Sequence, residues 1–232
     1  MLLGLVAGLG LFVLGHFAPF PFLLDTTATT VWRMPQADPP TVYLTFDDGP
    51  NPEATPALLD VLARHQATAT FFIIDKHLTA ETAPIVRRAF EEGHRVAVHS
   101  HTRTLMFYNP SWLAATLQEH AARIEVMTGH PPCRAFRPHG GNRSIPMLMG
   151  AARAGYKVIG WGWMLWDFNG FRKRNADDLV SRLTDRASPG DIVVIHDGHH
   201  ENPRADRDYA IETVDRLIPE LRARGFSLRT IC

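Results

Sequence analysis

The chain has 232 residues, 45% of them hydrophobic and 21% charged, and its 24 Lys and Arg balance 24 Asp and Glu. This length and composition are typical of one folded domain with a full hydrophobic core. The balanced charge and the lack of a basic run exclude the usual signature of a nucleic-acid-binding protein. The 12 histidines give a first indication of metal or acid–base chemistry, because imidazole serves both.

The first 24 residues carry no acidic or basic side chain apart from His16. A segment of this length can cross a hydrocarbon layer of about 30 Å at about 1.5 Å per residue. We therefore expect 1–24 to form a transmembrane helix or an uncleaved signal anchor, with a buried N-terminal helix as the alternative. Residues 25–40 are rich in Thr and Pro without periodicity, and they are expected to form a linker.

From residue 41 onward, short β-type runs alternate with amphipathic helical runs, which is typical of parallel strands joined by helical crossovers. The predicted strands cover 41–46, 68–74, 95–98, 134–137, 157–161, 191–195 and 226–231. The predicted helices cover 53–65, 80–92, 111–127, 144–154, 176–187 and 207–224. Ser111 is the expected N-cap of the third helix. About seven such units favour a (β/α) barrel over an open sheet.

The two cysteines, Cys133 and Cys232, lie almost a hundred residues apart. This is neither a disulfide scaffold nor the spacing of a zinc finger. Two free thiols are expected, with a single disulfide as the alternative, since spacing alone does not decide between them.

The strongest chemical signal is the run Asp47-Asp48-Gly49-Pro50, directly after the predicted strand 41–46. Catalytic groups of barrels collect at the carboxyl ends of the strands. Adjacent carboxylates at a strand end point in different directions, so one can bind a cation while the other acts as a general base. A solvated, Asp-rich turn is the alternative interpretation.

Four more polar segments follow later predicted strands. They are HSHTR at 99–103, FRPHGG at 136–141, WMLWDF at 163–168 and VIHDG at 194–198. Each alone is a weak signal, because a single His or Arg is usually structural or solvated. Five polar segments at the same end of successive strands predict convergence on one pocket.

In order and spacing, these segments resemble the polysaccharide deacetylases of carbohydrate esterase family 4, the NodB homology domain, over residues 41–232. The resemblance implies an α/β fold, a distorted (β/α)7 barrel, here preceded by one N-terminal hydrophobic helix. It also implies a metal-assisted hydrolysis of an acetamide or acetate ester on an acetylated glycan. An extracytoplasmic, membrane-anchored catalytic domain is expected, because the family's substrates are mostly cell-envelope polymers.

The resemblance also implies roles for individual residues. By position, Asp47 resembles the general base, Arg137 the arginine that orients it, and His196 the general acid. Asp167 resembles the carboxylate that orients this acid. The residues that resemble the walls of the substrate pocket are Trp166, Phe168 and Val194.

The implied cofactor is a divalent metal, commonly zinc, bound by Asp48 and His99. The family usually has a second His four residues after the first, but this chain has Arg103, which offers no lone pair to a metal. We expect His101 to substitute, because residues i and i+2 share a face of a strand. The alternatives are a catalytically degenerate glycan-binding protein on the same fold and an amidase acting on another small C–N bond.

Overall fold

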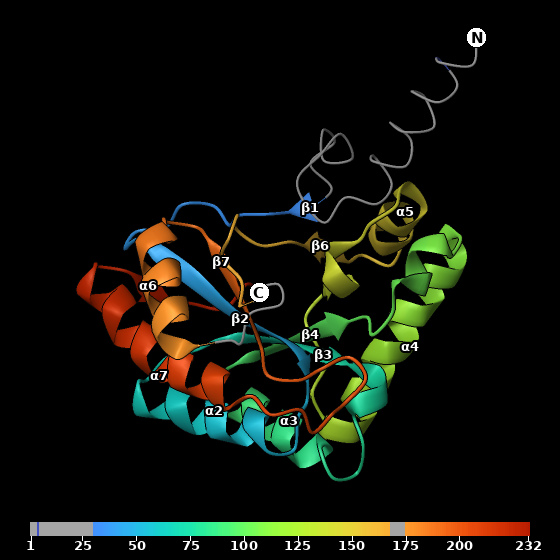
Figure 1. The fold of residues 1–232 in the computed structure, drawn as a ribbon. Helices are drawn as coiled ribbons and strands as arrows, with labels where there is room; N and C mark the ends of the chain where they lie inside the picture. The colour runs from blue at the N-terminus through green and yellow to red at the C-terminus, as the bar shows by residue number, and fades with distance from the viewer. Residues whose placement is uncertain (1–3, 5–29, 168–174) are drawn as a thin grey trace.

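The computed structural model describes residues 30–167 and 175–232, together with Gly4. Within them, parallel strands form one curled sheet (Figure 1). The strands in sheet order are β1 (Thr30–Val31), β6 (Lys157–Ile159), β5 (Ala135–Arg137), β4 (Arg95–His99), β3 (Thr70–Ile74), β2 (Thr41–Gly49) and β7 (Ile192–His196). β8 (Ser227–Leu228) pairs with β2 off this path. Single bridges join Arg33 to Asp191 and Trp166 to Val194, and so bring the two ends of the sheet together. The distorted (β/α)7 barrel is therefore confirmed.

Helices cover the outer face of the sheet, as Figure 1 shows. They are α2 (Ala54–Arg64), α3 (Ala83–Glu91), α4 (Pro110–Thr128), α5 (Ile145–Arg153), α6 (Ala176–Arg186) and α7 (Asp208–Ala223). Three short 3-10 turns lie between them: η2 (Asp75–His77), η3 (Arg103–Phe107) and η4 (His139–Gly141). α6 packs against α7, α7 against α2, and α4 against both α3 and α5. The helices therefore follow one another around the sheet in the same order as the strands.

Alternation along the strands separates an outer core from an inner one. On β2, Val42, Leu44 and Phe46 belong to the large apolar cluster beneath the helices. Tyr43, between them, points into the curl. The inner cluster consists of Tyr43, Phe72, Ala97, Ala135, Ile159 and Ile192, one residue from each of six strands. These side chains fill the interior of the barrel, so a site for substrate is expected at the carboxyl ends of the strands, past this cluster.

The predicted elements from 41 to 224 are confirmed with small shifts at their ends. Two differences have clear causes. The predicted N-cap Ser111 lies inside α4, because Pro110 occupies the first helical position and the side chain of Asn109 accepts a hydrogen bond from the Trp112 amide. The short strand β1 lies within the predicted linker and pairs with β6.

A disulfide joins Cys133 to Cys232, so the expectation of two free thiols was wrong. The bridge ties the segment before β5 to the segment after β8, across a sequence separation of 99. In the chain-entropy description, closing a loop of this length stabilises the fold by about 4–5 kcal/mol. The end of the chain is thereby held against the wall of the barrel.

The expected membrane helix at 1–24 lies outside the described residues, apart from Gly4. Among the helices of 30–167 and 175–232, none has both the length and the apolar character needed to cross a bilayer. The pocket residue Phe168 also lies outside the described residues.

Candidate active site

Four polar side chains occupy the inner face of the barrel, just beyond the inner apolar cluster. Asp47 lies four residues after Tyr43, and His196 lies four residues after Ile192. His99 and Arg137 each follow an inner alanine by two residues. Because even spacings along a strand keep the same face, all four point inward at the carboxyl ends of β2, β4, β5 and β7. The alternation of side chains along the strands therefore brings these four residues together at one end of the barrel.

Asp47 and Arg137 form a buried ion pair, with 2.6 Å between Arg137 Nη1 and Asp47 Oδ1. Arg137 Nη1 also donates to Thr45 Oγ1 at 2.8 Å, and Nη2 donates to the carbonyl oxygen of Gly160 at 3.0 Å. The guanidinium lies over the ring of Phe72, 4.0 Å from its centroid. These contacts fix the planar guanidinium, and the guanidinium in turn fixes the orientation of the Asp47 carboxylate.

A β-bulge turns Asp48 into the same site. In the pairing of β2 with β3, Asp47 lies opposite Phe72 and Gly49 lies opposite Ile73, which leaves Asp48 as the extra residue. Its φ of 70° is in the left-handed region, which Asp adopts more readily than most residues. In a regular strand, Asp48 would face away from Asp47. The bulge instead brings Asp48 Oδ1 to 3.2 Å from His99 Nε2.

Asp48, His99 and His139 each offer one ligand atom, and these three atoms lie within 4.8 Å of one another. His99 Nδ1 donates to the carbonyl oxygen of Arg137 at 2.7 Å, which leaves Nε2 as the free lone pair. Among the described residues, Asp48 Oδ1 and His139 Nδ1 are buried without a hydrogen-bond partner. Buried polar atoms are rarely left so, and an Asp-His-His set is typical of divalent metal sites. The residues therefore fit a divalent cation.

The protonation states agree with this fit. Burial lowers the pKa of His139 to about 4. The ring is therefore neutral at pH 7, as a metal ligand must be. Burial alone would raise the pKa of Asp48, but the adjacent His99, with His196 and His139, outweighs it and holds that pKa well below its usual range.

The expected substitute ligand, His101, is not part of this cluster. β4 ends at His99, so the strand alternation that would bring residue 101 to the same face no longer applies. His101 is half-buried, and its pKa is lowered by burial and by the charge of Lys76. The third side chain of the cluster is instead His139, at the start of η4. The signal for His139 was its place directly after the predicted strand 134–137.

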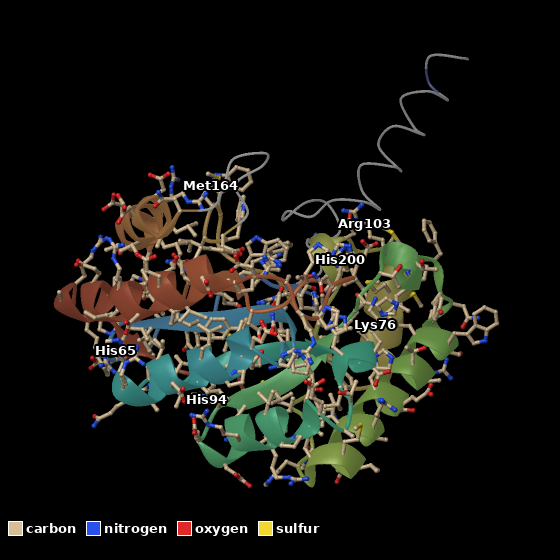
Figure 2. All side chains as sticks on the ribbon, turned by 60° about the horizontal axis from the view of Figure 1, so that its bottom comes forward. His65, Lys76, His94, Arg103, Met164 and His200 are labelled. Atoms are coloured by element: carbon tan, nitrogen blue, oxygen red, sulfur yellow. A yellow bond between two sulfur atoms is a disulfide. The ribbon has the colours of Figure 1, made fainter. Side chains whose placement is uncertain are left out.

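Arg103 lies at the rim of the site and is exposed. Its Nη2 atom is 3.7 Å from the position that a Cβ at Gly140 would occupy, so it lies beside the loop that carries His139. Figure 2 shows Arg103, His200 and Lys76 gathered on one side of the molecule. These three residues follow β4, β7 and β3, which places them at the carboxyl end of the barrel. Arg103 is thus a residue of the rim, beside the loop that carries His139.

His196 and Asp167 form the second pair of the site. His196 Nδ1 is 2.6 Å from Asp167 Oδ1, and Asp167 Oδ2 accepts hydrogen bonds from the His196 amide at 3.0 Å and the Tyr209 hydroxyl at 2.6 Å. Burial alone would lower the pKa of His196, but the charge and hydrogen bond of Asp167, helped by Asp48 and Asp47, raise it to about 9. The ring is therefore cationic at neutral pH and can donate the proton on Nε2. Tyr209 had no signal in the sequence, because it lies outside every motif.

This pair yields a titration that can be observed without substrate. In the metal-free protein, we expect the His196 ring to titrate near pH 9, because a raised pKa keeps the proton bound up to that pH. In the Asp167→Asn variant, loss of the negative charge should return the midpoint toward the ordinary value of about 6.5. NMR of the imidazole resonances measures both midpoints. A wild-type midpoint near 6.5, or no shift in Asp167→Asn, would contradict the role of this pair.

The predicted pocket residues occupy two places. Val194 is buried on the inner face of β7, two residues before His196. Trp166 is bridged to Val194 and lines a cavity of about 230 Å³. The other residues around this cavity are Trp32, Arg33, Trp161, Gly162, Trp163 and Asp191. The aromatic cavity therefore lies at the seam where β1 approaches β7, beside the polar site rather than in it.

Comparison with known proteins identifies the family of the chain. A family profile described as polysaccharide deacetylase matches residues 35–159. A chitooligosaccharide deacetylase of Sinorhizobium fredii is 33% identical over 198 residues, which cover 83% of this chain and 90% of that protein. A peptidoglycan-N-acetylglucosamine deacetylase of Bacillus cereus is 28% identical over 211 residues, covering 90% of this chain and 93% of the relative.

The solved structures give the same result. A family 4 acetyl xylan esterase from Clostridium thermocellum, solved in complex with a cobalt ion, superposes with a TM-score of 0.72 at 25% identity. The superposition covers 82% of this chain and 88% of that chain. The chain therefore belongs to the polysaccharide deacetylase family, carbohydrate esterase family 4, and is a hydrolase of that family.

Proposed function

We propose that the protein is a metal-dependent deacetylase that removes acetyl groups from an N-acetylated glycan. The observation that supports this most is the convergence of three units at one end of the barrel. These are the Asp47–Arg137 pair, the ligand group of Asp48, His99 and His139, and the Asp167–His196 pair. A base, a cation site and a proton donor are the three parts that metal-assisted hydrolysis of an amide by water uses.

The ligand group is suited to zinc or a similar divalent ion, since it combines one carboxylate with two imidazoles. When bound, such an ion supplies a Lewis acid that polarises the acetyl carbonyl and favours deprotonation of water beside it. Three protein ligands leave coordination positions open, as catalytic sites need. Two buried residues hold the reactive side chains in place: Arg137 orients Asp47, and Asp167 orients His196.

The protein side chains divide the proton transfers between them. Asp47, held by Arg137, accepts a proton from the attacking water as the new C–O bond forms. His196 donates its Nε2 proton to the amine nitrogen as the C–N bond breaks, so that acetate and the free amine leave. Val194 offers the apolar surface nearest to His196 on the inner face of β7, where the acetyl methyl group would lie.

The substrate class follows from the relatives. Two of them are named for chitooligosaccharides and for peptidoglycan N-acetylglucosamine. Both contain N-acetylglucosamine, so we propose an N-acetylglucosamine-containing glycan as the substrate.

We also propose that the catalytic domain is extracytoplasmic and membrane-anchored. Disulfides persist in oxidising compartments, and Cys133 is bonded to Cys232. The uncharged segment 1–24 has the length of a membrane anchor. An envelope glycan would be within reach of a domain attached in this way.

Acetate release tests the proposed activity. The full chain, stripped with chelator, is incubated with N-acetylglucosamine oligomers of several lengths, with and without added zinc or cobalt. We expect release only after the metal is restored. Release that is unaffected by chelation would remove the metal from the mechanism. A folded, metal-loaded protein that binds the oligomers without releasing acetate would instead be a degenerate glycan-binding member of the family.

A further inference from the structure

The backbone at Asp48 must be held in an unfavourable conformation for the ligand group to form. The left-handed region is sparsely populated by residues other than glycine, and such a conformation persists only where the surroundings enforce it. Asp48 has this conformation at the centre of the bulge, with a φ of 70°. The contacts around the bulge therefore determine where the Asp48 carboxylate points.

One side of the bulge is held by the backbone after β7. The amide of Gly198 donates to the carbonyl oxygen of Asp47 at 3.3 Å. A Cβ placed on Gly198 would lie 2.0 Å from the Asp48 carbonyl oxygen, so the two backbones are in direct contact. Arg207 Nε donates to the Gly198 carbonyl oxygen at 2.7 Å and secures this segment. Across the bulge, His77 Nδ1 donates to the Asp48 carbonyl oxygen at 3.1 Å.

The buried carboxylate of Asp197 packs behind the bulge. A Cβ placed on Gly49 would lie 2.4 Å from Asp197 Oδ2, so the carboxylate lies directly against the Gly49 backbone. Thr55 Oγ1 donates to this same oxygen at 2.5 Å. The Thr55 hydroxyl in turn accepts a hydrogen bond from the backbone N–H of Asn51 at 2.8 Å. Thr55 therefore links the start of α2 to Asp197, and Asp197 packs against the residue that follows Asp48.

We propose that Thr55 and Asp197 are positioning residues that lock the bulge and so aim the Asp48 carboxylate at His99 and His139. Neither residue belongs to the ligand group. Their effect passes through the backbone of Gly49. The inference deepens the proposed function, and it rests on the metal site described above. It also gives Asp197 a use distinct from that of its neighbour His196.

The test replaces the linking hydroxyl by a group of the same shape. Thr55→Val keeps the volume and the branched Cβ but removes the hydroxyl, whereas Thr55→Ser keeps the hydroxyl. We expect Thr55→Val to weaken zinc or cobalt binding by about 10–100-fold, the range found when a group that supports a ligand is lost. kcat for acetate release should fall with little change in KM, and Thr55→Ser should remain close to wild type. Calorimetric titration of the full, metal-free chain measures the affinity without any glycan.

The matched control is Thr128→Val, at the end of α4. Thr128 is also buried, and its hydroxyl donates to the carbonyl oxygen of Ile124 at 2.7 Å. This variant should lose comparable stability in urea while its metal affinity is unchanged. Wild-type metal affinity in folded Thr55→Val, or an equal loss of affinity in Thr128→Val, would refute the proposal.

A crystal structure of Thr55→Val decides the question independently of binding and turnover. We expect the Asp48 φ to leave the left-handed region or the carboxylate to turn away from His99. An unchanged bulge would refute the positioning role even if the protein proved inactive on every glycan. The proposed function is judged separately, by acetate release from the wild-type chain.

Discussion

Replacing Asp47 by asparagine is expected to lower kcat for acetate release by about 10²–10⁴-fold, the usual contribution of a positioned general base. Asparagine keeps the size of the side chain and an oxygen that can accept from Arg137, but its amide cannot take a proton from water. KM should change little, because substrate binding does not depend on the base. Initial rates on N-acetylglucosamine oligomers measure the effect, with circular dichroism to verify the fold.

Asp191→Asn provides the control for this change. Asp191 is also buried and pairs with Arg33 at 3.3 Å, but it lies just before the amino end of β7, away from the polar site. We expect this variant to retain kcat. Turnover at the wild-type rate in Asp47→Asn would show that another group accepts the proton.

Replacing His139 by alanine is expected to reduce zinc affinity by more than about 100-fold. Loss of a group that only supports a ligand already costs 10–100-fold, and a direct ligand should cost more. His101→Ala is the matched control, since it removes an imidazole two residues from His99 that lies outside the ligand group. Its affinity should stay within a few-fold of wild type. Metal content after dialysis and calorimetric titration both measure the difference.

Arg103→His provides a second check on the same ligand set. If the exposed rim position were able to serve the metal, this variant would restore binding in the His139→Ala background. We expect partial restoration, because Arg103 lies beside Gly140, the residue after His139, so an imidazole at this position would be close to the ligand group. Loss of metal in His101→Ala with retention in His139→Ala would favour the ligand set predicted from the sequence.

Most of the fold could be predicted because β-type runs and helical runs alternate along the chain, and because polar segments follow five of the seven predicted strands. The inward positions of Asp47, His99, Arg137 and His196 follow from counting in twos along strands. His101 was predicted by the same rule, which fails there because β4 has already ended. The alternation of side chains between the two faces applies only to residues inside the strand.

Three other features depend on distances that a sequence does not contain. The Cys133–Cys232 bridge joins residues that approach each other only after the barrel has closed. The bulge at Asp48 arises from the pairing of β2 with β3, and no residue pattern marks it. Likewise, β1 is two residues long and lies in a Thr- and Pro-rich segment, too short for any alternation to be seen.

The placement of β7 beside β2 has a consequence for how and when the protein becomes active. The pairing brings together an early strand and one that begins only at Ile192, so this part of the folding reaction waits for contacts between distant segments and is correspondingly slow. A chain still being synthesised, or one cut short before β7, would carry Asp47 and the group of Asp48, His99 and His139, but not His196. Its β2 edge would also be open to pairing with another chain. Activity therefore requires that β7 has been synthesised and has paired with β2.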